Sequence, residues 1–266
     1  MAQNGLFPVS ISRHKDRYWR PFTSYSFARG LRESILVAAE ILPAAAALPI
    51  AFRQQEEGVL PVALLSMDEE ADTPVVSAGG QWLAGYVPSA LRCHPFCAEP
   101  VKDAVGSSRL CVDEASGLVT TNRHDQAFFA ETGDLAPELR DILSFFQARQ
   151  FALAETQKLC TLLEKMGLLT PLDRHEGHRL PDGLMGVSGK RLERLSQAQM
   201  TLLLNSGALQ MIHAHQVSLS HCGWLSRARQ QITTTSANSE DLSGFITALA
   251  TDAANPHIEW EAAHAV

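Results

Sequence analysis

The chain lacks the motifs that mark the common nucleotide-binding and hydrolytic enzymes. It contains no phosphate-binding glycine loop, no G-x-S-x-G nucleophile elbow, and neither a zincin nor an EF-hand pattern. Gly183, Gly186 and Gly189 lie close together, but the sequence around them does not supply the strand and helix that a dinucleotide site requires. None of these sequence motifs therefore indicates an enzymatic activity.

Paired cysteines are also missing. The five cysteines are an odd number, and no two of them form a C-x-x-C pair. Cys93 and Cys97 are four positions apart, but no further thiol or imidazole ligands stand at the spacing of a structural zinc site. Scattered thiols are typical of a reducing compartment, and we expect them to be small buried apolar side chains.

Excess positive charge and long apolar runs are absent as well. The 266 residues carry a formal net charge of −7, which argues against nucleic acid as a partner. The cations between Arg13 and Arg20 are expected to lie in a solvated loop or edge strand. No apolar leader begins the chain, and Glu40 and two prolines interrupt the run from Ile35 to Phe52. We therefore predict a soluble, cytoplasmic protein without a membrane span.

What is present is the composition of a globular protein. Hydrophobic residues make up 45% of the chain and charged residues 19%, so a folded core is expected. Short apolar segments with turn residues give way to helical spacing at about residue 134. We predict an α+β protein in which an antiparallel sheet from the N-terminal half packs with helices from the C-terminal half. The predicted domain spans residues 1–230, followed by a linker and a short C-terminal helix and tail over 231–266.

Local signals in the first half predict one helix and several strands. Ser34 is placed to cap a helix over 34–47, and the glycine pair at 79–80 favours a hairpin over 75–87. Two strands are predicted over 50–53 and 59–66. Pro61 has no N–H group, so the second of these strands is expected at a sheet edge.

The second half carries stronger helix signals. Helical spacing covers 134–166, as one helix or two. A capping box opens a helix at Ser196, and Gly207 ends it. Residues 209–220 fit either a strand or a helix.

Histidines near the C-terminus are the strongest enzymatic signal. His213, His215 and His221 lie close together in the sequence, beside Cys222. In a strand, His213 and His215 would share one face and could grip a metal ion. In a helix they would diverge by about 200° and could not. A metal-assisted enzyme that uses these histidines is the alternative function, while the leading interpretation requires no cofactor.

Glu40 is a carboxylate among alanines and leucines. A carboxylate in an apolar helix must find a partner or shift its pKa. Arg92 is the expected partner, because it also stands in an apolar stretch. The pair could be a structural lock, or the polar floor of a pocket lined by Trp82 and Tyr86.

The region from Ala38 to Phe96 resembles a known family. The segments AAE, LPIAF and PVALLS are followed by a match to G-x-W-x-x-x-Y-x-P-x-x-x-R-x-x-P-F at Gly80, Trp82, Tyr86, Pro88, Arg92, Pro95 and Phe96. Weaker elements continue to about Leu225. With these residues the chain is similar to the SapC family of bacterial proteins, which is named for surface-layer arrays.

The resemblance implies no activity, cofactor or catalytic residue. It does imply a link to surface-layer or envelope biology, or to the handling of a peptide or metabolite. We therefore predict a binding or assembly factor without enzymatic activity, whose partner is a protein or peptide, or else a small molecule. Its oligomeric state is not predicted. The expected contact residues are Trp82, Tyr86, Arg92, Phe96 and Glu40.

Overall fold

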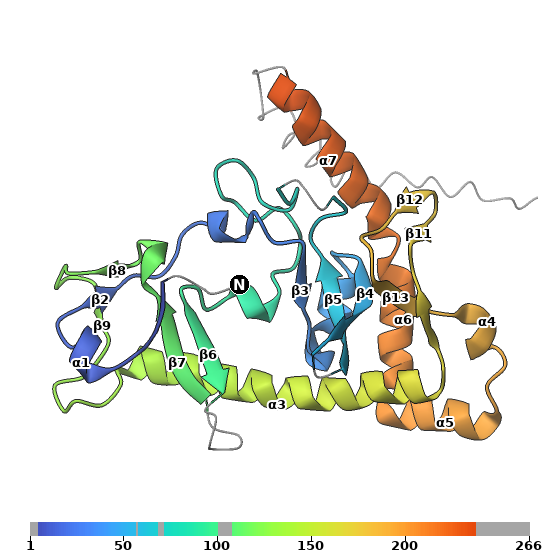
Figure 1. The fold of residues 1–266 in the computed structure, drawn as a ribbon, viewed down its shortest axis with the longest axis horizontal. Helices are drawn as coiled ribbons and strands as arrows, with labels where there is room; N and C mark the ends of the chain where they lie inside the picture. Colours follow the sequence, from blue (N-terminus) through green and yellow to red (C-terminus); the bar gives the residue numbers. More distant parts are fainter. Residues whose placement is uncertain (1–4, 57, 69–71, 101–107, 238–266) are drawn as a thin grey trace, which may run out of the picture. The chain divides into compact units, whose positions relative to one another are not determined.

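The computed structural model describes residues 5–56, 58–68, 72–100 and 108–237 (Figure 1). The chain divides into a unit that ends at Ser226 and a second unit that begins at Arg227. All the sheets and the candidate site lie in the first unit. No helix in the described part of the chain is both long enough and apolar enough to cross a membrane.

All strand pairs among the described residues are antiparallel. The largest sheet has the order β10-β13-β4-β5-β3 and is formed by Leu169–Pro171, Leu184–Val187, Ile50–Gln55, Gly58–Leu64 and Glu33–Ile35. A second sheet has the order β1-β7-β6, formed by Leu6–Pro8, Ser108–Asp113 and Phe96–Pro100. Two small sheets are β8-β2-β9, formed by Val119–Thr120, Tyr18–Trp19 and Gln126–Ala127, and β11-β12, formed by Arg174–His175 and His178–Arg179.

Seven helices lie among the described residues. They are α1 to α7, at Ile11–His14, Ile41–Ala45, Pro137–Lys165, Gly189–Leu192, Gln197–Ser206, Ala208–Ser218 and His221–Ala237. Four short 3₁₀ turns, η1 to η4, lie at Ser26–Ala28, Ala38–Glu40, Ser89–Leu91 and Glu114–Ser116. The predicted α+β class with antiparallel pairing is confirmed, although the strands form several sheets and β10 and β13 come from the second half.

Helix α3 runs past both larger sheets (Figure 1) and contacts β5, β6 and β7. Leu139, near its start, belongs to a small core with Trp19 and Phe128. Leu163, near its end, belongs to the main core, which also includes Phe52. Strand β5 is buried over most of its length and β4 over its first three residues, because α3 contacts β5 and α6 contacts β4.

Two local predictions were wrong. Ser34 lies in β3 rather than at a helix start, and the predicted helix over 34–47 is reduced to η2 and α2. Strand β5 is interior, between β4 and β3, and not at an edge. Pro61 is tolerated there because it stands opposite Leu36, just beyond the end of β3. The hydrogen bond that Pro61 cannot donate is therefore not missing from the ladder with a neighbouring strand.

Other local predictions are confirmed. The helical spacing predicted over 134–166 corresponds to the single helix α3, which spans Pro137–Lys165. Helix α5 is capped by Ser196, whose hydroxyl accepts from the amide of Gln199, and it ends at Gly207 with a φ of 83°. The segment 209–220, which fitted either a strand or a helix, is resolved as a helix by α6, which ends at Ser218.

Two segments need separate mention. The predicted hairpin over 75–87 is reduced to a single bridge between Val76 and Trp82. Residues 231–237 continue α7, and the remainder of the predicted tail lies outside the described residues.

Candidate functional site

The carboxylate of Glu40 is buried at the junction of η2 and α2, with 5% of the residue exposed. Its Oε1 atom accepts hydrogen bonds from the Tyr86 hydroxyl at 2.9 Å and the Ser89 amide at 2.6 Å. Its Oε2 atom accepts from the Ser89 hydroxyl at 2.6 Å and the Val37 amide at 3.2 Å. Four donors therefore satisfy the charge, as a buried carboxylate requires. We call this arrangement the Glu40 lock.

Arg149 of α3 completes the Glu40 lock. Its Nε donates to the Ser89 hydroxyl oxygen at 2.9 Å, and its Nη2 donates to the carbonyl of Ile35 at 2.9 Å. Burial lowers the pKa of Arg149, and the nearby Glu40 charge opposes that shift. The Ser89 hydroxyl thus bridges the Glu40 carboxylate and the guanidinium of Arg149, which lies on a helix remote in the sequence.

The predicted ion pair between Glu40 and Arg92 was wrong. Arg92 is exposed at the end of η3, where its Nε and Nη2 donate to the carbonyl of Val87 at 3.0 and 2.8 Å. Its guanidinium carbon lies 5.1 Å from the centre of the Tyr86 ring, which is cation–π range. Arg92 therefore stabilises its own loop, because a residue that caps η3 reaches back to the preceding carbonyl.

The aromatic residues of the predicted site separate into two places. The Trp82 indole donates to the carbonyl of Tyr86 at 2.9 Å, and its ring lies 5.3 Å from that of Tyr25. Burial, followed by the hydrogen bond to Glu40, raises the pKa of Tyr86 to about 12, so its hydroxyl keeps its proton. Phe96 is instead buried in the small core, edge-to-face with Trp19 at 4.9 Å.

The three histidines do not come together, which contradicts the alternative of a metal site that required a strand. Because α6 is a helix, His213 is exposed while His215 is 1% exposed. The Nε2 of His215 accepts from the Val187 amide at 3.1 Å, so its Nδ1 carries the proton and donates to the carbonyl of Ile50 at 2.7 Å. No group of three or more potential ligands occurs among the residues that the structure describes.

An open apolar groove lies between α2, α5 and α6. It has a volume of about 730 Å³ and is lined by Leu42, Ala45, Ala46, Leu204, Gly207, Leu209, Gln210, His213, Ala214 and Val217. None of these residues carries a permanent charge. Leu42, Leu204 and Val217 are 52%, 64% and 67% exposed, although they are large and apolar. Contiguous exposed apolar surface of this kind marks interaction sites.

The Glu40 lock and the groove share helix α2. Glu40 is the residue directly before α2, whose Leu42 and Ala45 line the groove. At the other end of α2, the Nε2 of His221 lies 3.1 Å from the carbonyl oxygen of Ala45. His215 fastens α6, the opposite wall, to strands β4 and β13. Sequence reasoning missed Ser89, Arg149 and the groove.

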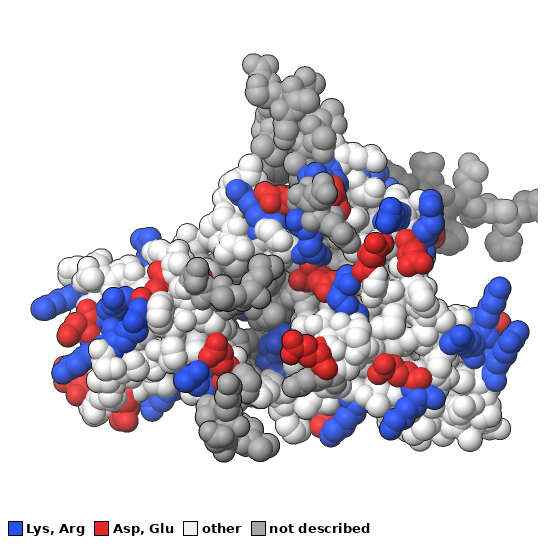
Figure 2. All heavy atoms as spheres, in the orientation of Figure 1, with Lys and Arg blue, Asp and Glu red and all other residues white. Residues whose placement is uncertain are grey.

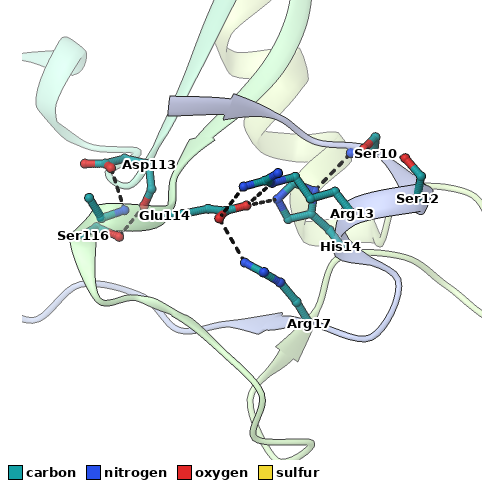
Figure 3. A network of polar contacts seen from close by, with 9 residues as sticks. Ser10, Ser12, Arg13, His14, Arg17, Asp113, Glu114 and Ser116 are labelled. Atoms are coloured by element: carbon teal, nitrogen blue, oxygen red, sulfur yellow. Dashed lines mark hydrogen bonds and ion pairs between the residues drawn. The ribbon is translucent and has the colours of Figure 1, made fainter. Parts of the chain in front are cut away.

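A second polar network ties α1 to η4 (Figure 3). Glu114 lies 2.5 Å from the Nε of Arg13, 3.0 Å from the Nη1 of Arg17 and 3.2 Å from the Nε2 of His14. Its hydrogen bond with Arg13 is the main cause that lowers the pKa of Glu114. Two cations of the basic run are therefore engaged by one carboxylate, and charges of both signs are interspersed on the face that Figure 2 shows.

The described residues define a mixed α+β protein built around a buried, fully hydrogen-bonded carboxylate. The chain belongs to the SapC family, whose model matches residues 9–225. The match includes every residue of the Glu40 lock and of the groove. No curated protein and no solved structure matches the chain.

Proposed function

We propose that this SapC-family protein is a binding or assembly factor whose apolar groove receives an amphipathic helix of a protein partner. The groove carries the proposal, because its lining combines three exposed aliphatic side chains, Leu42, Leu204 and Val217, with small residues at Ala45, Gly207 and Ala214. A groove lined by both large and small apolar residues can accept a ridge of side chains from another helix. The lining carries no permanent charge, which favours an apolar face over an ionic ligand.

The Glu40 lock supports this function because it holds one wall of the groove in place. It fixes the start of α2, and so places Leu42 and Ala45 against α6. In the same proposal Trp82, Tyr86 and Arg92 form a second contact surface, since Arg92 is exposed and the two rings are half-buried. Glu40 and Phe96 act only from the interior. The surface-layer or envelope link that the family resemblance implies directs the search for the partner.

Site-directed photocrosslinking in the native cell tests the proposal. A photoreactive residue at Leu204 or Val217 should form an adduct with a protein, and the linked peptide should have helical apolar spacing. Phe151 is the matched control site, because it is 70% exposed on α3 and does not line the groove. The same adduct from position 151 would contradict the proposal, as would a groove adduct with a second copy of the chain or with a lipid.

Affinity measurement gives the second arm. Val217→Asp should weaken binding of the synthetic linked peptide at least tenfold, because burying a valine contributes about 1.5–3 kcal/mol. Phe151→Asp should leave the affinity unchanged. Both positions are exposed, so each variant should keep its unfolding free energy within about 0.5 kcal/mol. Equal affinities for the two variants would refute the role of the groove.

A further inference from the structure

Two cysteines stand directly opposite each other in the β6–β7 pair. Cys97 is the register partner of Cys111. The amide of Asp113 donates to the carbonyl of Pro95 at 2.9 Å, so these two opposed residues form a hydrogen-bonded pair. Every second pair along an antiparallel ladder is of this kind, which includes Cys97 and Cys111. Their Cα atoms are then about 5.5 Å apart, within the roughly 4.4–6.8 Å that a disulfide spans.

The two thiols also share one face of the sheet. Directly opposed residues point to the same side of an antiparallel pair. The next pair on that side is Glu99 and Arg109, whose Oε2 and Nη2 atoms meet at 3.0 Å. Opposed side chains on this face therefore converge. Phe96 and Val112 point to the other face, into the small core.

The two thiols differ in access. Cys97 is half-buried, whereas Cys111 is fully buried, and both are free. Burial, followed by the neighbouring Cys111, raises the pKa of Cys97 to about 12. Burial raises the pKa of Cys111 to about 11. Both groups are thus protonated thiols at neutral pH, and the accessible one must react first.

We propose that Cys97 and Cys111 form an oxidation site that a small disulfide such as oxidised glutathione converts into a cross-strand disulfide. The Cys97 thiolate attacks one glutathione sulfur, the glutathione S–S bond breaks, and one glutathione thiolate leaves and takes up a proton. The Cys111 thiolate then attacks the Cys97 sulfur and releases the second glutathione. Two protein thiols are oxidised and one glutathione disulfide is reduced, and β6 becomes covalently joined to β7.

Disulfide mapping tests this site. The full chain is incubated with oxidised glutathione, free thiols are alkylated, and the digest is analysed by mass spectrometry. The wild type and Cys93→Ser should give the linked peptides of Cys97 and Cys111. Cys111→Ser should stop at a glutathione adduct on Cys97, and Cys97→Ser should leave Cys111 reduced.

The pH dependence adds a second readout. The rate should rise about tenfold per pH unit between pH 7 and 9, because the thiolate fraction rises in that proportion below the pKa. Absence of the linked peptides in the wild type would overturn the proposal. A link between Cys93 and Cys97, or a glutathione adduct on Cys111 in Cys97→Ser, would also overturn it.

Discussion

Replacement of Glu40 by glutamine tests the Glu40 lock with the smallest change of shape. Glutamine keeps one acceptor oxygen and places an amide NH2 group, which only donates, at the position of the second carboxylate oxygen. In either orientation, two of the four donors lose their acceptor. If the Oε1 side is kept, the Val37 amide faces another donor, while the Ser89 hydroxyl can turn to accept. Arg149 also loses the nearby negative charge.

The magnitude follows from these contacts. A hydrogen bond to a charged group contributes about 1.5–3 kcal/mol, and one donor pair regains part of its loss by rotation of Ser89. We therefore expect Glu40→Gln to lower the unfolding free energy by about 3 kcal/mol. For a chain of this size the melting temperature should fall by roughly 6–12 °C. Urea-induced unfolding, monitored by tryptophan fluorescence, measures the change in unfolding free energy.

Two companion variants make the result decisive. Arg92→Ala should cost below about 1 kcal/mol, since Arg92 is exposed and binds only its own loop. Ser89→Ala should cost about 2 kcal/mol and couple to Glu40→Gln by more than about 1 kcal/mol in a double-mutant cycle. The reasoning is refuted if Arg92→Ala destabilises as much as Glu40→Gln, or if Ser89→Ala is neutral.

Two further variants probe the same unit. His215 has its pKa lowered to about 4 by burial, against about 6.5 when unfolded, so its contribution is complete above about pH 6.5 and is lost as the pH falls towards 4. That loss should reach about 3 kcal/mol by pH 4, and His215→Gln should remove this slope from the stability profile measured by denaturant titration; an unchanged slope would contradict it. Gly80→Ala should cost about 1–2 kcal/mol, because Gly80 has a φ of +81° and a Cβ atom there would lie 1.8 Å from the Ser24 hydroxyl oxygen. Gly79→Ala is the matched control and should be close to neutral, since its Cβ would meet nothing nearer than 3.8 Å; equal losses for the two glycines would rule out the conformational argument.

The sequence by itself determined the features that depend on neighbouring residues. Ser196 and Gly207 bounded α5 because a capping box and a left-handed glycine act within one helical turn. The burial of Glu40, and its need for partners, followed from the apolar residues around it. The helical spacing of α3 was equally local, since one face of that helix had to be apolar.

Only the tertiary structure decided which distant groups meet. Arg149 contacts Ile35 across 114 positions, and nothing in the sequence of α3 indicates which distant groups Arg149 will meet. Pro61 indicated an edge strand, but the short length of β3 made an interior place acceptable. His213 and His215 diverged once packing against β4 and β13 made α6 a helix. The groove exists only because α2, α5 and α6 come together, so no single segment could predict it.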